Sequence, residues 1–308
     1  MSKKFLVTGG CGFIGSHLVE HLSQAGHLVT VIDDLSSGYR SNLADAGPVD
    51  VLIEKRVEDV DLSELAGFDG VFHLAAQASV PLSVKNFYAS SSTNLLSTLK
   101  VIDYCAINHI PLVYASSSAI YGNLPVGDEY GSVDLLSPYS ADKLMAEIYC
   151  DIANKLYGLR SYGLRFFNVY GPRQDPKNPY SGVISIFADR ILKGKSITIN
   201  GGHQTRDFIY VDDIVRGLWN SYHYLFERSV STYSNLLTGN SISIDELANI
   251  LMLLAGNRVE KRYQKLPAGD PERSLGTIDR MHDQLKMGQF VKLDDGLRQV
   301  LTWMRTNS

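Results

Sequence analysis

Residues 6–18, LVTGGCGFIGSHL, place Gly9, Gly12 and Gly15 at the turn between an apolar run and an amphipathic one. This order predicts a strand, a tight turn and a helix. Glycine lets the chain turn sharply and lets backbone approach a pyrophosphate, and the free N–H groups that open a helix attract phosphate. The stretch therefore predicts a dinucleotide-binding turn. The cofactor contacts expected from it are Gly9, Gly12, Phe13, Ile14 and Gly15.

The first half of the chain repeats this strand–helix alternation. The runs HLVTVIDD, GVFHLAAQ, PLVYASSS and LRSYGLRFFNVYG predict strands, VDVLIEKRV predicts a further one, and amphipathic stretches lie between them. Nearly continuous apolar strands that alternate with helices are typical of a parallel sheet covered on both faces. We therefore expect an α/β fold with a Rossmann-type, doubly wound parallel sheet.

After residue 172 the pattern changes. GPRQDPKNPYSG predicts a long loop, and the elements beyond it lack strict alternation. We predict a cofactor domain over residues 1–172, with return segments around 205–240, and a smaller mixed α/β substrate domain over 173–308. YSNLLTG is expected to return to the main sheet as a strand.

Composition narrows the functional classes. The 308 residues are 44% hydrophobic and 20% charged, with a formal net charge of -4. The absence of a basic block argues against nucleic acid as a partner. No apolar run approaches the length of a membrane span, and MSKKFLVTGG lacks the core of a signal peptide, so we expect a cytoplasmic protein without membrane contact. Three separated cysteines and no Cys/His cluster predict reduced thiols and no metal site.

The second strand ends in an acidic pair. Asp33 lies 18 residues after Gly15, where a carboxylate accepts hydrogen bonds from the adenosine ribose and repels a 2′-phosphate. This favours NAD over NADP. Asp33 could instead cap the turn before LSSG, a role that Asp34 could equally fill. In HLAAQASV, the small side chains of Ala75 and Ala76 would let NAD lie against the strand end. The remaining cofactor candidates are Asp34 and Leu74.

The stretch SPYSADK, residues 137–143, sets Tyr139 and Lys143 one helical turn apart. The serines of YASSSAIYG follow a strand, at the edge where ligands of open α/β sheets bind. Because nearby positive charge favours the phenolate, Tyr139 could act as a general base near neutral pH. One of the serines at 116–118 would then hold the substrate oxygen.

Six motifs carry a family resemblance: TGGCGFIG, HLAAQASV, SSSAIYG, PYSADK, RFFNVYGPRQ and RDFIYVDDI, in that order. The chain resembles the extended short-chain dehydrogenase/reductases that act on nucleotide sugars. The resemblance implies Tyr139 as catalytic acid/base, Lys143 as ribose ligand and pKa modifier, and Ser117 as the catalytic hydroxyl, with Ser116 and Ser118 as assistants. It also implies that Asn94 faces the catalytic site.

The same resemblance predicts the reaction. Dehydratases of this family carry an acid directly after the hydroxyl residue, whereas this chain has Ser118-Ala119. We therefore expect epimerisation at C4 of a nucleotide sugar, with NAD regenerated in every cycle. The alternatives are a glucuronate epimerase or decarboxylase, a net reductase and a catalytically silent NAD-binding protein.

The resemblance also implies a UDP-sugar site. Asn168 and Arg206 would meet the diphosphate, Val183 and Ile184 would line the nucleotide, and Asp270 would meet a ribose hydroxyl. The residues assigned to the sugar and to a second phosphate clamp are Ser274 and Arg273.

The resemblance also links the bulk of the side chain at position 274 to the size of the sugar. Serine there leaves room for an N-acetyl group, which favours UDP-N-acetylglucosamine and UDP-N-acetylgalactosamine over UDP-glucose and UDP-galactose. Two other positions depart from the family pattern. Arg273 would replace a family arginine at the position of Pro267. Lys55-Arg56 stand where the family often has an adenine-contacting acid, and Glu58 and Asp59 are the candidates to replace that acid. Relatives commonly pair two helices into a four-helix bundle, so we expect a homodimer.

Overall fold

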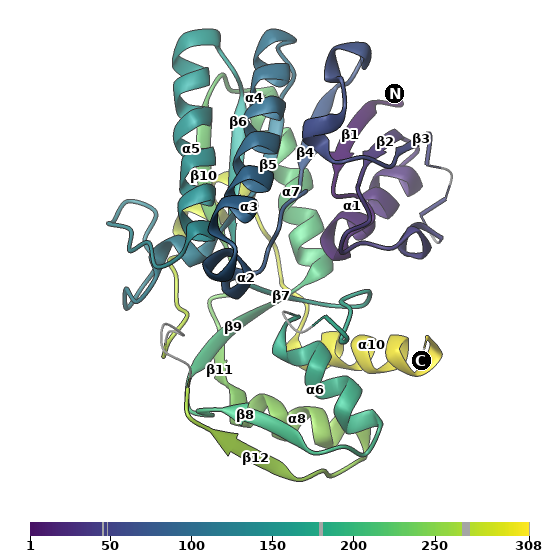
Figure 1. Cartoon of the computed structure of the whole chain (residues 1–308), viewed down its shortest axis with the longest axis vertical. Coiled ribbons are helices and arrows are strands. Elements are labelled where there is room, and N and C mark those ends of the chain that lie inside the picture. Colours follow the sequence, from purple (N-terminus) through teal and green to yellow (C-terminus); the bar gives the residue numbers. More distant parts are fainter. Residues whose placement is uncertain (45, 48, 179–180, 267–271, 308) are drawn as a thin grey trace.

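The computed structural model describes residues 1–44, 46–47, 49–178, 181–266 and 272–307. Figure 1 shows a larger part built on one broad sheet, above a smaller part that holds two short sheets and the helices α6, α8 and α10.

The broad sheet has seven parallel strands in the order β10-β6-β5-β4-β1-β2-β3. They are β1 (Lys4–Thr8), β2 (Leu28–Ile32), β3 (Val51–Ile53), β4 (Gly70–His73), β5 (Leu112–Ser117), β6 (Ser161–Phe166) and β10 (Ser231–Leu236). The strand order reverses between β1 and β4, and ligands of such sheets bind at the carboxyl ends beside this point. The predicted Rossmann-type sheet is confirmed.

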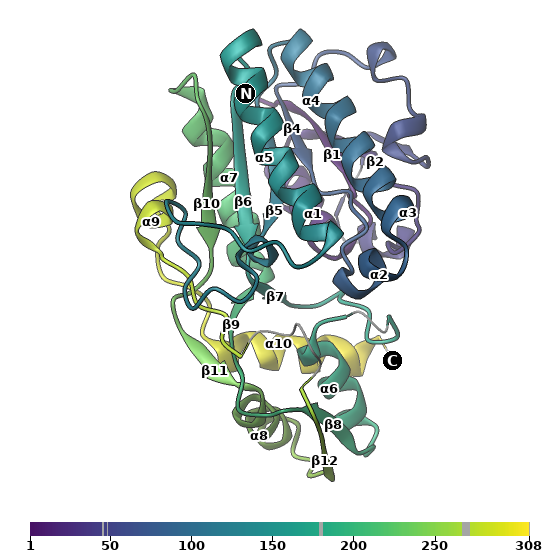
Figure 2. The same cartoon turned by 60° about the vertical axis from the view of Figure 1, so that its left-hand side comes forward.

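Helices cover both faces of this sheet (Figure 2). One face packs on α1 (Phe13–Gln24) and α7 (Val211–Phe226), the other on α4 (Ser97–Ile107) and α5 (Pro138–Tyr157). Strand β1 shows why: Phe5 and Val7 enter the first core and Leu6 the second. Alternate side chains of a strand point to opposite faces, so a strand buried on both sides is apolar throughout.

Short elements join these layers. The helices α2 (Val80–Lys85) and α3 (Phe87–Ser91) lead through the π turn η4 (Ser92–Leu96) into α4. The 3₁₀ turns are η1 (Arg40–Leu43), η2 (Val57–Asp59), η3 (Leu62–Glu64) and η5 (Ser118–Tyr121).

The smaller part contains two sheets. One has the order β11-β9-β7 and the other pairs β12 with β8. Their strands are β7 (Asn168–Tyr170), β8 (Ile197–Asn200), β9 (Thr205–Tyr210), β11 (Ser241–Ser243) and β12 (Lys261–Gln264). The helices of the smaller part are α6 (Val183–Leu192), α8 (Ile244–Ala255) and α10 (Leu293–Thr306). Helix α9 (Asp279–Leu285) packs instead against β10 and α7 of the larger part. A smaller mixed α/β unit, predicted from the sequence, is confirmed. The proposed boundary at residue 172 stays a prediction.

One predicted strand is wrong in its extent. LRSYGLRFFNVYG divides into β6 of the broad sheet and β7 of the three-stranded sheet, with only Phe167 between them. The side chain of Phe167 is buried beside Tyr121 and Leu237, so the chain changes sheets at an apolar residue that carries no polar signal. YSNLLTG supplies β10, which pairs with β6. None of the helices in the described part of the chain combines the length and apolar character needed to cross a bilayer.

Candidate active site

The glycine turn after β1 leaves no room for side chains. A Cβ on Gly15 would lie 2.0 Å from the carbonyl oxygen of Gly9, and one on Gly9 would lie 2.7 Å from the backbone nitrogen of Ala75. Gly9 also has a φ of 72°, in the left-handed region. Backbone therefore lies open to a ligand at this turn, which is the arrangement that a bound pyrophosphate needs.

A cavity of about 440 Å³ adjoins the turn. Its lining includes cofactor candidates from three separate stretches of the chain: Gly9, Gly12, Asp33, Asp34, Leu74, Ala75 and Ala76. Phe13 and Ile14 open α1 and pack against the core of the smaller part. The cavity thus fits a dinucleotide whose phosphates lie on the turn and whose adenosine reaches the end of β2.

The two acids after β2 have different roles. Asp33 is buried, and its carboxylate accepts hydrogen bonds from the backbone N–H groups of Cys11 (2.8 Å) and Leu35 (2.9 Å). Burial raises the pKa of Asp33, and these N–H groups oppose the rise. Asp34 instead accepts from the backbone N–H and the hydroxyl of Ser36, so it caps the turn. Asp33 therefore remains the ribose candidate.

The far end of the cavity is lined by Lys55, Arg56 and Glu58. Arg56 donates a hydrogen bond to the hydroxyl of Thr93 over 2.9 Å, and its Nε lies 3.5 Å from Glu58 and 3.9 Å from Asp34. Glu58, one of the expected replacements for the adenine-contacting acid, therefore lies at the cavity and is paired with this arginine.

Helix α5 begins at a strong N-terminal signal. Ser137 and Ser140 form a reciprocal capping box, with Pro138 at the first helical position. This fixed start places Tyr139 and Lys143 in the first turns of the helix. Lys143 is buried, its ammonium donates to the carbonyl oxygen of Ala115 over 2.8 Å, and its Nζ lies 5.7 Å from the centroid of the Tyr139 ring.

The pKa of Tyr139 departs from expectation. Burial raises it, Asp142 adds to the rise, and a hydrogen bond with the Ser117 hydroxyl opposes it. The expected lowering by Lys143 is therefore absent in the protein alone, because desolvation of the phenolate dominates. Burial also lowers the pKa of Lys143 to about 8.

The three consecutive serines lie in different surroundings. The hydroxyl of Ser116 donates to Glu147 over 2.5 Å, and Glu147 is held by Arg165 through two hydrogen bonds. Ser117 hydrogen-bonds Tyr139 and accepts from the backbone N–H of Ala119, at the start of η5. Ser118 is the first residue of η5. Ser117 is therefore placed beside the phenol of Tyr139, whereas the hydroxyl of Ser116 is directed to a buried carboxylate.

Asn94 occupies the π turn η4 and is buried. Its side-chain oxygen accepts from the backbone N–H of Gln77 (2.7 Å), and its amide donates to Asp142 on α5 (3.2 Å). Asn94 thus ties the loop that follows β4 to α5. Its predicted place facing the catalytic site and the cofactor stays a prediction.

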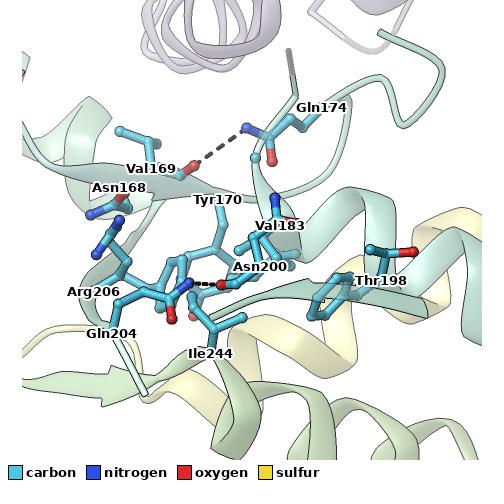
Figure 3. A pocket seen from close by; sticks show the side chains of 14 residues that line it. Asn168, Val169, Tyr170, Gln174, Val183, Thr198, Asn200, Gln204, Arg206 and Ile244 are labelled. Atoms are coloured by element: carbon cyan, nitrogen blue, oxygen red, sulfur yellow. Dashed lines mark hydrogen bonds between the residues drawn. The ribbon is translucent and has the colours of Figure 1, made fainter. Parts of the chain in front are cut away.

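A second cavity, of about 270 Å³, lies in the smaller part (Figure 3). Among its lining residues are the substrate candidates Asn168, Val183, Ile184 and Arg206. Sequence reasoning missed the other lining residues, among them the polar side chains of Gln174, Thr198, Asn200 and Gln204. Gln174 stands within the motif RFFNVYGPRQ and could have been found there, whereas Thr198 and Asn200 alternate along a short strand without any motif.

Residues near the chain's end are placed unequally. The hydroxyl of Ser274 lies 3.5 Å from the Asn168 amide nitrogen, and its backbone N–H donates to the carbonyl of Thr205. Arg273 is exposed and does not line the second cavity. Asp270 and Pro267 lie outside the described residues. The proposed sugar residue thus stands beside the diphosphate candidate Asn168.

Known proteins match this arrangement. Residues 5–224 match the NAD dependent epimerase/dehydratase family. The chain is 34% identical to the UDP-glucose 4-epimerase of Mycolicibacterium smegmatis, over 98% of this chain and 99% of that protein.

Solved structures agree with this match. A UDP-N-acetylglucosamine 4-epimerase from Methanobrevibacter ruminantium, in complex with UDP-N-acetylmuramic acid, superposes with a TM-score of 0.93 at 36% identity, over 100% and 99% of the two chains. The UDP-glucose 4-epimerase of Thermotoga maritima with UDP-glucose gives 0.92 at 33%, over 99% of each chain.

The fold and the site therefore define an α/β dinucleotide-binding enzyme. The chain belongs to the NAD dependent epimerase/dehydratase family. Its cofactor is NAD, as the sequence predicted. Within the described ranges, no group of three or more His, Cys, Asp or Glu side chains is arranged to hold a metal ion.

Proposed function

We propose that this enzyme interconverts the C4 epimers of a UDP-hexose through a 4-keto intermediate. One observation carries the proposal. Tyr139 is hydrogen-bonded to Ser117 and lies near the buried Lys143, and the motif SSSAIYG that contains Ser117 has no acidic residue. An alcohol at C4 can be oxidised and reduced by such a set, whereas elimination of water needs a further acid.

The protein's own groups carry the proton. Tyr139 takes the proton from O4 of the sugar while the Ser117 hydroxyl holds that oxygen, and the same phenol returns it after the 4-keto sugar has turned over. Burial raises the pKa of Tyr139, so a phenolate there needs positive charge beside it. Lys143 keeps its positive charge below a pH of about 8 and would supply part of that charge. When bound, NAD supplies the acceptor and donor for the C4 hydride.

The substrate's nucleotide end would lie in the second cavity. Arg206 offers a guanidinium, a natural partner for a diphosphate, and Asn168 offers an amide at the same wall. Ser274 stands beside Asn168 and has a small side chain. Its size supports UDP-N-acetylglucosamine and UDP-N-acetylgalactosamine as the preferred pair, with UDP-glucose and UDP-galactose also accepted.

Purified enzyme incubated separately with UDP-N-acetylglucosamine, UDP-glucose and UDP-glucuronate tests the proposal once the products are separated. The expected product is UDP-N-acetylgalactosamine, formed without net change in the nicotinamide absorbance. Tyr139→Phe should bind NAD normally and turn over about 10²–10⁴ times more slowly. Tyr157→Phe, at the exposed end of the same helix, is the control. Unchanged turnover in Tyr139→Phe would refute the proton path.

The second candidate is a UDP-glucuronate 4-epimerase or decarboxylase. Arg273 favours it, because an exposed guanidinium next to Ser274 could pair with a sugar carboxylate. Conversion of UDP-glucuronate alone in the incubation above would select this candidate.

We also propose that two copies associate through α5. Ile148, Ile152 and Leu156 are exposed at four-residue spacing, and therefore share one face of the helix. Phe87 and Tyr88 on α3 are exposed as well, and α3 packs against α5. Apolar surface of this kind marks an interaction site. Sedimentation should give a dimer for the wild type and for Leu253→Glu on α8, and a monomer for Ile152→Glu.

A further inference from the structure

A buried carboxylate, Glu129, lies outside the reacting groups yet joins three parts of the chain. Its Oε1 accepts a hydrogen bond from the backbone N–H of Asn235 in β10, over 2.9 Å. Its Oε2 accepts from the hydroxyl of Thr277. The Asn235 amide in turn donates to the carbonyl oxygens of Gly127 (2.9 Å) and Thr277 (3.1 Å). A buried carboxylate needs such donors, and here they come from β10 and from Thr277, two places far from Glu129 in the sequence.

Residues 272–277, called here the 272–277 segment, are held at both ends by backbone. Near its end, Gly127 donates to the carbonyl of Leu275 (2.8 Å) and accepts from the N–H of Thr277 (3.0 Å). Near its start, the backbone N–H of Ser274 donates a hydrogen bond to the carbonyl of Thr205 over 3.2 Å. Thr205 opens β9, the strand that carries Arg206. The segment thus runs from the loop beyond the catalytic serines to the strand of the proposed diphosphate site.

The same hydrogen bonds continue to the catalytic strand. The Tyr121 hydroxyl donates to the Asn235 side-chain oxygen (2.6 Å) and accepts from Arg165 (2.7 Å). Arg165 pairs with Glu147 on α5, which receives the Ser116 hydroxyl. All of these side chains are buried. A continuous buried network therefore links the neighbour of Ser117 to the segment that carries Ser274.

We propose that Glu129, together with Thr277 and Asn235, positions the 272–277 segment so that Ser274 stands at a fixed place relative to Ser117 and Tyr139. The inference rests on the proposed function. Glu129 and Thr277 would then be positioning residues for the sugar. They would touch neither substrate nor cofactor, but they would fix the position of Ser274, beside which the 4-keto hexose rotates. If these residues only stabilised the fold, replacing them would lower the free energy of unfolding but would not affect binding of the sugar more than binding of the nucleotide.

Thr277→Val tests this proposal, because it removes the hydroxyl that meets Glu129 and keeps the side-chain shape. Thr277→Ser keeps the hydroxyl and is the matched control. Calorimetry on the NAD-loaded enzymes would give the Kd of UDP and of UDP-N-acetylglucosamine, and kinetics would give KM and kcat. In Thr277→Val we expect about tenfold weaker binding of the sugar nucleotide, the usual worth of a hydrogen bond to a charged group. UDP binding and NAD binding should stay within about twofold, as such distant changes do, and Thr277→Ser should resemble the wild type.

Other outcomes overturn the proposal. Equal weakening of UDP and of UDP-N-acetylglucosamine would show that Thr277 serves the nucleotide or the whole fold. A lower Tm with unchanged sugar binding would assign it to stability alone, and a Thr277→Ser enzyme as weak as Thr277→Val would remove the hydroxyl from the argument. A wild type that binds both ligands equally would show that no wall acts on the sugar. If the wild type binds UDP-hexoses but converts none of them, the proposed function is overturned instead. The Kd values of UDP and of UDP-N-acetylglucosamine would still test the positioning role.

Discussion

The two cavities of this enzyme are built in different ways. Where the first cavity adjoins the glycine turn, it is formed by backbone, because a Cβ on Gly15 or Gly9 would collide with the main chain. The cavity in the smaller part is lined by side chains from β7, α6, β8, β9 and α8. A site built from backbone depends on local sequence, whereas a site built from side chains depends on how distant elements pack. Substitutions should therefore affect the two sites by separate routes.

Gly15→Ala should give the largest effect. Its methyl group would overlap the Gly9 carbonyl, so the turn must move. We expect NAD affinity to fall about a hundredfold or more, since overpacking costs on the order of 3 kcal/mol. UDP affinity should change little. Calorimetry with each ligand measures both, and Gly288→Ala, where nothing lies within 4 Å of the new Cβ, is the control. Equal loss of both ligands would contradict the separation of the two sites.

Arg206→Lys reverses the pattern. A lysine keeps the charge but cannot form two parallel hydrogen bonds to a diphosphate. UDP should bind about thirtyfold more weakly, the worth of about 2 kcal/mol for charge-assisted hydrogen bonds, and NAD should bind as before. Arg298→Lys, an exposed position on α10, should have no effect. Undiminished UDP affinity would remove Arg206 from the diphosphate site.

Asp33→Asn tests whether a side chain also contributes to NAD binding, beside a turn that is formed by backbone. The amide keeps one acceptor for the N–H groups of Cys11 and Leu35 and loses the other. NAD should bind about tenfold more weakly, and discrimination against NADP should narrow because the negative charge is gone. Asp34→Asn should show neither change, since Asp34 caps a turn. Equal effects of the two substitutions would reassign the ribose contact.

For Lys143→Met the measured effect is the dependence of stability on pH. Burial lowers the pKa of Lys143 from 10.5 to about 8, so between these values the unfolded chain binds more protons than the folded one. Raising the pH through this window should therefore stabilise the cofactor-free wild type relative to the variant, by about 1 kcal/mol per pH unit. Urea unfolding at pH 8, 9 and 10 measures this difference. Lys155→Met, exposed on the same helix, should show none. Parallel stability curves for wild type and Lys143→Met would contradict the lowered pKa.

The same contrast explains what could be read from the sequence. The glycine turn, Asp33 and the pair on α5 were predictable because each signal lies within a few residues and next to a helix or strand boundary. Asn168 and Arg206 were reached through motifs, and they do line one cavity.

What escaped the sequence depends on packing at a distance. Three serines in a row give no hint of their directions, and Glu147, 31 positions after Ser116, decides between them. Likewise, the pKa of Tyr139 was expected to fall because its charged neighbour is visible in the sequence, whereas the burial that raises it appears only in the fold. The division of residues 159–171 between two sheets had no local marker either.

The division of residues 159–171 between two sheets fixes the spacing between the two sites. With Phe167 as the sole residue between β6 and β7, Arg165, which holds the catalytic helix through Glu147, and Asn168, at the proposed diphosphate site, are separated by two residues of chain. An extended chain advances about 3.3 Å per residue, so this spacing has little slack. Under the proposed function, the number of phosphates in the substrate sets the distance between its nucleoside and C4 of its sugar. We therefore expect a nucleotide sugar with a single phosphate to be a poorer substrate than one with two.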